Sequence, residues 1–195
     1  MTSVRAAVLI VLATVALALS GCSTGPLDAT QSGGTPAKPV ALLTVLPSPG
    51  SLRGVPAATA DAPALQRAFT GPEDDQLAGR IRDRAPSAAA VRSWRGPRGG
   101  FLVAAVSVWD SHIVATGVGS DLATMLAEKG GAAWTPSDVP GSRGARVEDP
   151  ARREIRLAYS VGPNSLYVRA TGPVPDETVT KTLRRMIEAL AGEAG

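Results

Sequence analysis

The sequence predicts an α+β domain in which an antiparallel sheet, built from two strand–strand–helix units, carries helices packed on one face. Residues 88–95 and 101–109 have the apolar and β-branched content of strands and are joined by a loop rich in glycine and proline. Residues 154–161 and 165–171 form a second such pair around a short turn. Each pair is followed by apolar residues at helical spacing, and hairpins followed by helices are typical of α+β folds.

In the first unit, residues 101–109 are apolar on both faces, as expected for a central strand that is covered on both sides. Asp110 or Ser111 is the expected cap of the following helix, and Gly130 is its expected stop. The apolar stripe of that helix consists of Val114, Val118, Leu122, Met125 and Leu126.

Two glycines within this helix leave an alternative open. Gly117 and Gly119 each cost a helix roughly 1 kcal/mol. Residues 112–118 would then form a strand, and a shorter helix would begin at a cap on Ser120.

The second unit repeats this order. Residues 154–161 alternate apolar and polar side chains, which predicts a half-buried strand. Residues 173–177 open the last helix, which has acidic residues in its first turn and ends at Gly192. Its apolar stripe consists of Val179, Leu183, Met186, Ile187 and Leu190.

Three further elements are expected upstream. The apolar residues 40–46 predict a first strand or an extended segment docked on the domain. Residues 61–69 predict a short helix, and residues 72–84 predict a second one that begins with a proline and three acids.

The N-terminus has the features of an export signal. Arg5 precedes an apolar run over residues 6–19, whose 14 residues are too few to span a bilayer core comfortably. The run ends in Leu19-Ser20-Gly21-Cys22, which resembles the lipobox of bacterial lipoproteins. The resemblance implies that Cys22 becomes the first mature residue and carries acyl chains such as palmitate. The alternative is an ordinary secretory signal cut after residues 16–18, which would leave the Cys22 thiol free.

The expected organisation is therefore a signal peptide over residues 1–21, a lipidated cysteine with a flexible tether over 22–39, and a single α+β domain over 40–192. The tether is rich in Gly, Pro, Ser and Thr and has too little apolar surface to order itself. Two or more acyl chains would hold the protein on the membrane, because each buried methylene contributes about 0.8 kcal/mol.

Composition restricts the partners. The chain has a net charge of +3, and removal of residues 1–21 takes away one arginine, which leaves 19 basic against 17 acidic side chains. A net charge of +2 is a weak driver for nucleic acid, so no nucleic-acid partner is expected. Cys22 is the only cysteine, which excludes an internal disulfide. Seventeen arginines against three lysines, with abundant alanine and glycine, suggest a high-GC, actinobacterial source.

Catalytic and cofactor motifs are not found in the sequence. His112 is the only histidine, and Asp110-Ser111-His112 are adjacent residues that cannot face one another as a triad requires. One histidine and one cysteine are too few for an ordinary zinc site. We therefore expect no catalytic residue, no metal site and no cofactor, and interpret His112 as a surface or packing residue at the start of a helix.

Two groups of residues are candidates for binding. Arg92, Arg95 and Arg98 lie close together in the sequence and could form an anion patch; the alternative is that they are solvated surface. Trp134 and Arg143 lie in residues 130–146, the longest irregular segment of the domain, and could form a binding rim. The alternative for Trp134 is that it folds back and caps the edge of the sheet.

The lipobox, the tether and a small α+β domain together resemble actinobacterial cell-envelope lipoproteins. The layout of residues 88–191 is also similar to the external sensor domains of some actinobacterial receptor kinases. The resemblance implies a lipid-anchored protein on the outer face of the cell membrane that acts as a non-catalytic binding or sensing module. Its expected partners are the membrane, through the lipid, and an envelope protein, a wall polymer or a lipid ligand. The alternatives are a carrier with an apolar cavity, an envelope hydrolase and a purely structural protein.

Overall fold

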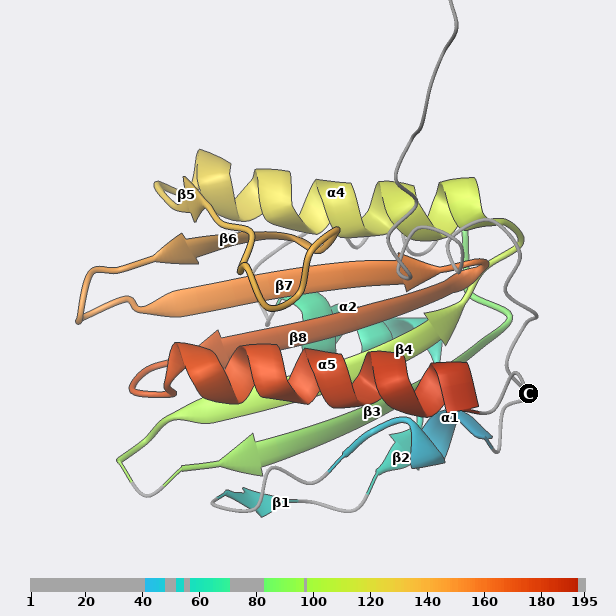
Figure 1. Cartoon of the computed structure of the whole chain (residues 1–195), viewed down its shortest axis with the longest axis horizontal. Coiled ribbons are helices and arrows are strands. Elements are labelled where there is room, and N and C mark those ends of the chain that lie inside the picture. Colours follow the sequence, from blue (N-terminus) through green and yellow to red (C-terminus); the bar gives the residue numbers. More distant parts are fainter. Residues whose placement is uncertain (1–40, 48–51, 55–56, 71–82, 97, 193–195) are drawn as a thin grey trace, which may run out of the picture.

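The computed structural model describes residues 41–47, 52–54, 57–70, 83–96 and 98–192 (Figure 1). The expected signal peptide, the expected lipobox with Cys22, the expected tether and most of the expected helix 72–84 lie outside the described residues.

One antiparallel sheet organises the described residues, with the strand order β1-β3-β4-β8-β7-β6-β5 and with β2 also paired to β3 (Figure 1). The strands are β1 (Arg53–Gly54), β2 (Ala58–Thr59), β3 (Ala88–Arg95), β4 (Phe101–Val108), β5 (Ala132–Ala133), β6 (Arg143–Val147), β7 (Glu154–Val161) and β8 (Asn164–Thr171). The helices are α1 (Ala41–Thr44), α2 (Ala62–Thr70), α4 (His112–Glu128) and α5 (Asp176–Gly192).

The two predicted hairpins, β3–β4 and β7–β8, form the centre of the sheet. They are joined by β4 and β8, which pair along their whole length from Phe101 opposite Thr171 to Val108 opposite Asn164. The β7–β8 turn has two residues, and Gly162 takes a φ of 54°, which glycine adopts without a steric penalty. The α+β class and the two strand–strand–helix units are thus confirmed.

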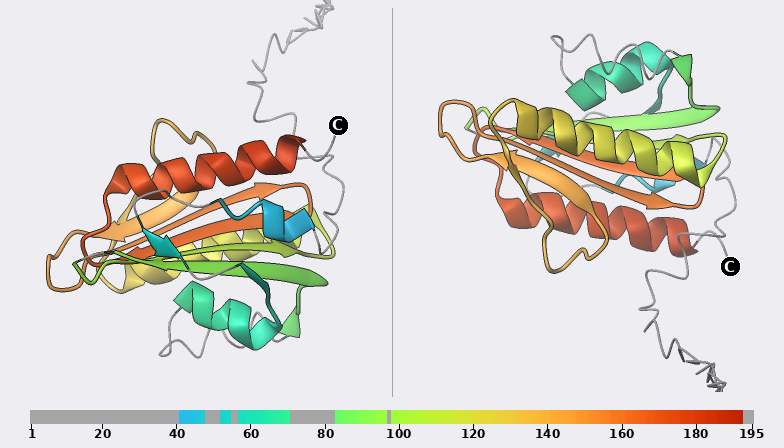
Figure 2. Two further views of the ribbon diagram at one scale, coloured as in Figure 1. Left: turned by 90° about the horizontal axis from the view of Figure 1, so that it is seen from below. Right: turned by 90° about the horizontal axis from the view of Figure 1, so that it is seen from above.

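The helices cover both faces of the sheet, so the expectation of a single covered face is wrong (Figure 2). On one face, α1 and α5 contribute Leu42 and Leu183 to a cluster that includes Leu102 and Val106 of β4. On the other face, α2 and α4 contribute Phe69 and Leu122, among others, to a cluster with Ala105 and Tyr167. The apolar character of both faces of β4 was the sequence signal for this arrangement.

Because both faces are covered, β7 is not the half-buried strand that its alternation predicted. Ile155 and Leu157 face α5, as expected. Ala158 faces α4, and the polar residues of the same face are largely enclosed: the side chain of Arg156 is 2% exposed and that of Glu154 is 18% exposed. Glu154 and Arg156 of β7 thus form a largely enclosed ion pair instead of lying on a solvent-facing surface.

Helix α4 is continuous from His112 to Glu128, so the alternative in which residues 112–118 form a strand is wrong. Ser111 is its N-cap, and the Ser111 side chain accepts a hydrogen bond from the Val114 backbone N–H at 3.3 Å. Packing explains why a glycine stands at position 119, since a Cβ added there would lie 3.0 Å from the Cβ of Ala158 in β7. The glycine therefore allows α4 to approach the sheet closely.

Two other expectations need correction. Residues 41–44 form the short helix α1, and no strand, because Leu42, Val45 and Leu46 are spaced to lie on one face of a helical turn, where all three are buried. The segment 130–146, expected to be irregular, contains β5 and β6.

The interior between β4 and α5 is occupied by packed side chains. Leu102 and Val106 of β4 and Leu183 and Met186 of α5 are all 0% exposed and belong to one apolar cluster. This packing gives no support to a carrier with an apolar cavity at that place.

Candidate binding site

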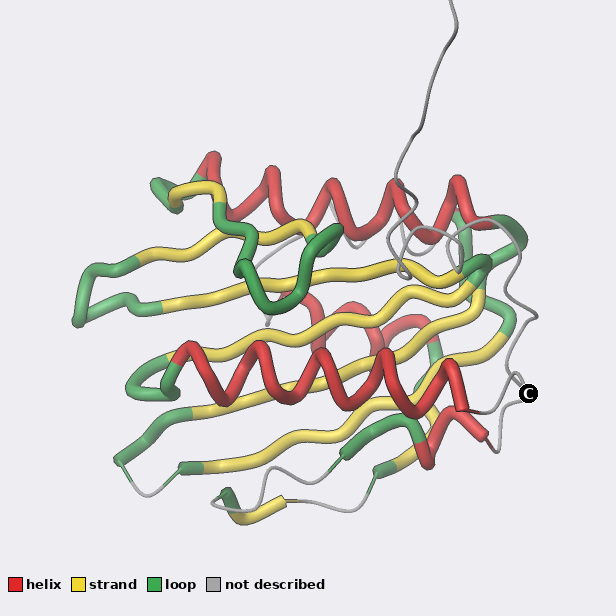
Figure 3. The backbone as a smooth tube through the Cα atoms, in the orientation of Figure 1, coloured by secondary structure: helices red, strands yellow, loops and turns green. Residues whose placement is uncertain are grey.

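The loop between β5 and β6 lies at one edge of the sheet and folds toward α5 (Figure 3). Its first residue, Trp134, donates its backbone N–H to the carbonyl of Gly144 at 2.9 Å. Val139 is buried in the cluster beneath α5, and Asp138 forms an ion pair with Arg184 of that helix. The loop is thus attached to both β6 and α5.

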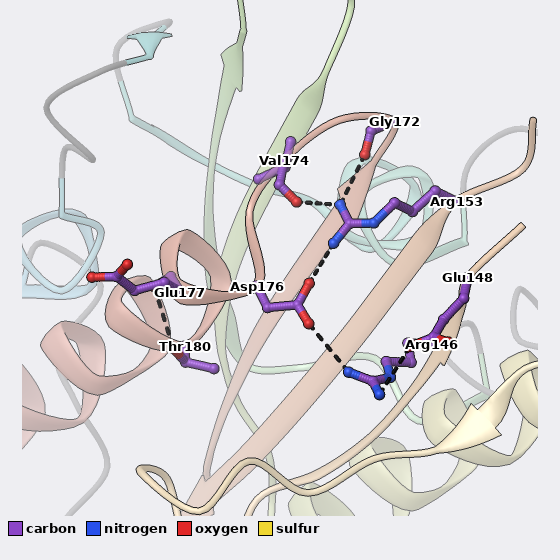
Figure 4. A network of polar contacts seen from close by, with 8 residues as sticks. All are labelled: Arg146, Glu148, Arg153, Gly172, Val174, Asp176, Glu177 and Thr180. Carbon is purple, nitrogen blue, oxygen red and sulfur yellow. Dashed lines mark hydrogen bonds and ion pairs between the residues drawn. The ribbon is translucent and has the colours of Figure 1, made fainter. Parts of the chain in front are cut away.

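A network of ion pairs lies at the start of α5 (Figure 4). Asp176, the first residue of α5, pairs with Arg146 of β6 at 3.2 Å and with Arg153, which precedes β7. Arg153 also donates to the carbonyl oxygens of Gly172 and Val174. One carboxylate therefore connects β6, the β6–β7 loop and the segment that leads into α5.

Arg146 has two further contacts that define the site. Its guanidinium pairs with Glu148 at 2.9 Å and lies 5.5 Å from the centre of the Trp134 ring. This distance is within the range of a cation–π interaction. The Trp134 ring also packs against the apolar cluster beneath α5, and it is half-buried. The alternative interpretation, in which Trp134 folds back on the edge of the sheet, is therefore correct for the buried part of the side chain.

An open groove lies between the loop and α5, with a volume of about 510 Å³. It is lined by Trp134, Thr135, Pro136, Ser137, Asp138, Asp176, Glu177 and Thr180. An aromatic ring, hydroxyl groups and carboxylates suit non-covalent recognition of a polar ligand. We call these residues the Trp134 groove.

Arg143 lies on the other face of the sheet edge, because it stands opposite Ala158, which faces α4. Its guanidinium donates to the hydroxyl of Ser120 in α4. It lines a smaller pocket of about 60 Å³. Trp134 and Arg143 thus flank the same loop but face different hollows.

The three arginines of the predicted anion patch are not brought together. Arg92 lies on the α5 face of β3, where it donates to the carbonyl of Leu46 and lies 5.3 Å from the Trp94 ring. Arg95 is three positions further along β3 and so lies on the opposite face, and Arg98 is exposed in the β3–β4 turn.

His112 is exposed at the start of α4 and lines neither hollow. Within the described ranges, no group of three or more His, Cys, Asp or Glu side chains is placed to hold a metal ion. Among the same residues, no helix is both long enough and apolar enough to cross a membrane.

Sequence reasoning selected Trp134 as a candidate but did not select Arg146, Asp138 or Asp176, which the structure places near it. Asp176 was interpreted only as an acid in the first turn of a helix, which it also is. Its contacts join residues 23 and 30 positions apart, and no local pattern encodes such pairs.

Comparisons with known proteins identify the fold. No family model matches this chain, and no curated protein matches it. Among solved structures, the chain is similar to the extracellular domain of PknH from Mycobacterium tuberculosis, with a TM-score of 0.51 and 10% sequence identity. The match covers 82% of this chain and 100% of that domain. At this identity the likeness shows a shared fold, and it agrees with the layout expected from the sequence.

Proposed function

We propose that this protein is a lipid-anchored lipoprotein of the cell envelope, and that its α+β domain is a non-catalytic binding or sensing module on the outer face of the membrane. The observation that carries the proposal is the fold likeness, which extends over the whole of an extracellular domain from a mycobacterium. The lipobox at residues 19–22 supports export and anchoring independently of the fold.

The Trp134 groove is the proposed recognition surface. Asp176 is matched by Arg146 and Arg153, so its charge serves to connect the elements around the groove. Glu177 and Thr180 line the groove from the first turns of α5. A wall polymer or an envelope protein would be recognised here by stacking, hydrogen bonds and charge, without a covalent step.

Anchoring is tested with the full-length gene in an actinobacterial host. Metabolic labelling with palmitate is expected to mark the wild-type protein in the membrane fraction, and Cys22→Ser is expected to lose the label and leave the membrane. Label that persists in the Cys22→Ser variant, or a wild-type protein found only in the cytoplasm, contradicts the anchoring.

Recognition is tested by tryptophan fluorescence, in which the response to an added ligand is selective for Trp134. Trp94 and Trp109 are 0% and 2% exposed, whereas Trp134 is half-buried at the groove. Purified wall polysaccharide or peptidoglycan fragments are expected to shift the emission and to protect it from acrylamide quenching. Glu177→Gln is expected to weaken that response, and Glu188→Gln, an exposed acid elsewhere on α5, is the matched control. An equal response in both variants contradicts the assignment of the groove.

A further inference from the structure

We propose that the small pocket beside Arg143 binds an oxyanion, either a carboxylate or a phosphate group, and that this group belongs to the ligand of the proposed binding module. The pocket lies between α4, the loop before β6 and the end of β7. It is lined by Thr116, Gly119, Gly141, Arg143, Ala158, Tyr159 and Ser160. We call these residues the Arg143 pocket.

Arg143 differs from the other arginines of its region in what it contacts. Seven arginines lie between residues 143 and 184, and six of them form ion pairs with carboxylates: Arg146, Arg152, Arg153, Arg156, Arg169 and Arg184. Arg143 instead donates to the hydroxyl of Ser120. That hydroxyl donates in turn to the Thr116 carbonyl at 3.1 Å, so its oxygen is free to accept from Arg143. The guanidinium is thus held in place without being neutralised by the described residues.

The lining of the pocket complements a negative charge. Its residues include one arginine, Thr116 and Ser160 with hydroxyl side chains, and no Asp or Glu. Guanidinium N–H groups match the geometry of carboxylate and phosphate oxygens, and hydrogen bonds to a charged acceptor are stronger than neutral ones. A cationic ligand finds no acidic side chain in this lining.

The backbone creates the space for the ligand. Strand β6 begins at Arg143 opposite Ala158, so residues 159–161 of β7 extend beyond it. The preceding turn closes with a hydrogen bond from Ser142 to Val139, and Gly141 takes a φ of 82° there. A single water needs roughly 10–15 Å³ of such space. The pocket of about 60 Å³ therefore accommodates a group of a few heavy atoms.

A buried hydroxyl next to the pocket is a second, independent indication of a ligand. Ser165 of β8 stands directly opposite Ser160, so the two side chains share the α4 face at close range. Ser165 is 0% exposed, and its hydroxyl has no hydrogen-bond partner among the described residues. A buried hydroxyl without a partner costs roughly 1–3 kcal/mol. Ser165 does not itself line the pocket, so an oxyanion there would accept this proton through one water.

The test uses the mature lipoprotein, purified from membranes in a non-ionic detergent. Equilibrium dialysis measures the binding of labelled inorganic phosphate, acetate and glycerol phosphate. Arg143→Gln is expected to weaken binding about tenfold or more, since a charged hydrogen bond contributes roughly 1.5–3 kcal/mol. Arg152→Gln, an exposed arginine paired with Asp149, is the matched control and is expected to bind like the wild type.

Ser165→Ala gives a readout that a purely structural role would not produce. It is expected to raise the melting temperature of the free protein, because it removes an unsatisfied hydroxyl, and to weaken anion binding. Preference for glycerol phosphate over inorganic phosphate would indicate a lipid headgroup or a wall polymer, and equal affinity would indicate a free ion.

Binding that is absent in the wild type, or that is equal in the wild type and Arg143→Gln, overturns the proposal. Its failure is distinguishable from failure of the proposed function, because membrane anchoring and the Trp134 response are measured separately.

Discussion

Glu154 provides the most demanding test of the structure, because one carboxylate serves two enclosed arginines. Its Oε1 accepts from Arg156 Nε at 2.7 Å and from Arg169 Nε at 2.8 Å. The side chains are 18%, 2% and 15% exposed, in the order Glu154, Arg156 and Arg169. Glu154→Gln therefore places two guanidinium groups side by side without the carboxylate between them.

Removing one partner of a buried ion pair costs about 3–5 kcal/mol. Glu154 keeps some contact with solvent, so we expect the lower end, about 3 kcal/mol. With a urea dependence of about 2 kcal/mol per M, the unfolding midpoint should fall by roughly 1–2 M. Arg169→Gln should cost less, because it leaves a one-to-one pair between Glu154 and Arg156. If Arg169→Gln destabilises the protein as much as Glu154→Gln, the reasoning is wrong.

The same cluster predicts a pH dependence. Burial alone would raise the pKa of Glu154, but the charges of Arg169 and Arg156 and their hydrogen bonds outweigh it and hold the pKa below its ordinary value of 4.5. A carboxylate with a lowered pKa in the folded state stabilises the protein above the unfolded value, and this stabilisation is lost as the pH falls through the folded value. The difference in unfolding free energy between the wild type and Glu154→Gln should thus be constant near neutral pH and narrow below about pH 4.5. A difference that widens on acidification refutes the assignment.

Ser111, Gly117 and Asp176 provide three shorter tests by urea denaturation. Ser111→Ala should cost about 1 kcal/mol through loss of the α4 cap, whereas Asp110→Ala next to it should change little. Gly117→Ala should stabilise the protein by up to about 1 kcal/mol, because nothing lies within 4 Å of the added Cβ in the helix. Asp176→Asn should cost only about 1 kcal/mol, because its ion pairs are partly exposed and screened, and added salt should reduce the difference.

The elements that could be predicted correctly are those whose signals lie within a short stretch of the sequence. The β7–β8 hairpin was recognisable from its alternation and its Gly162 turn, and α5 was recognisable from its acidic start and its apolar stripe. The structure confirms the buried positions Val179, Leu183, Met186 and Leu190 of that stripe. In these elements, periodicity and turn chemistry agree with the tertiary packing.

The sequence failed where tertiary pairing decides the structure. β1, β2 and β5 have two residues each, which is too few for a periodic pattern, and they exist because a longer strand beside them offers free hydrogen-bonding groups. The face that a helix covers is set by how the chain leaves the strand, which the order of elements does not reveal. The Trp134 groove was only half-predicted, because Asp176 reaches Arg146 and Arg153 across the fold.

The covering of both faces also limits where this domain can recognise a ligand. In the described residues, α1 and α5 occupy one face of the sheet and α2 and α4 the other, so the broad surfaces of the central strands are committed to the core. The edge at β6 stays available, because this five-residue strand does not extend along residues 159–161 of β7 and the loop from Trp134 to Ser142 lies between two hollows. At this edge β6 packs closely against β7, because a Cβ added at Gly144 would collide with the backbone carbonyl oxygen of Arg156. The shortness of β6 therefore positions both the Trp134 groove and the Arg143 pocket, and a ligand that contacts both would bridge the two faces of the sheet around one edge.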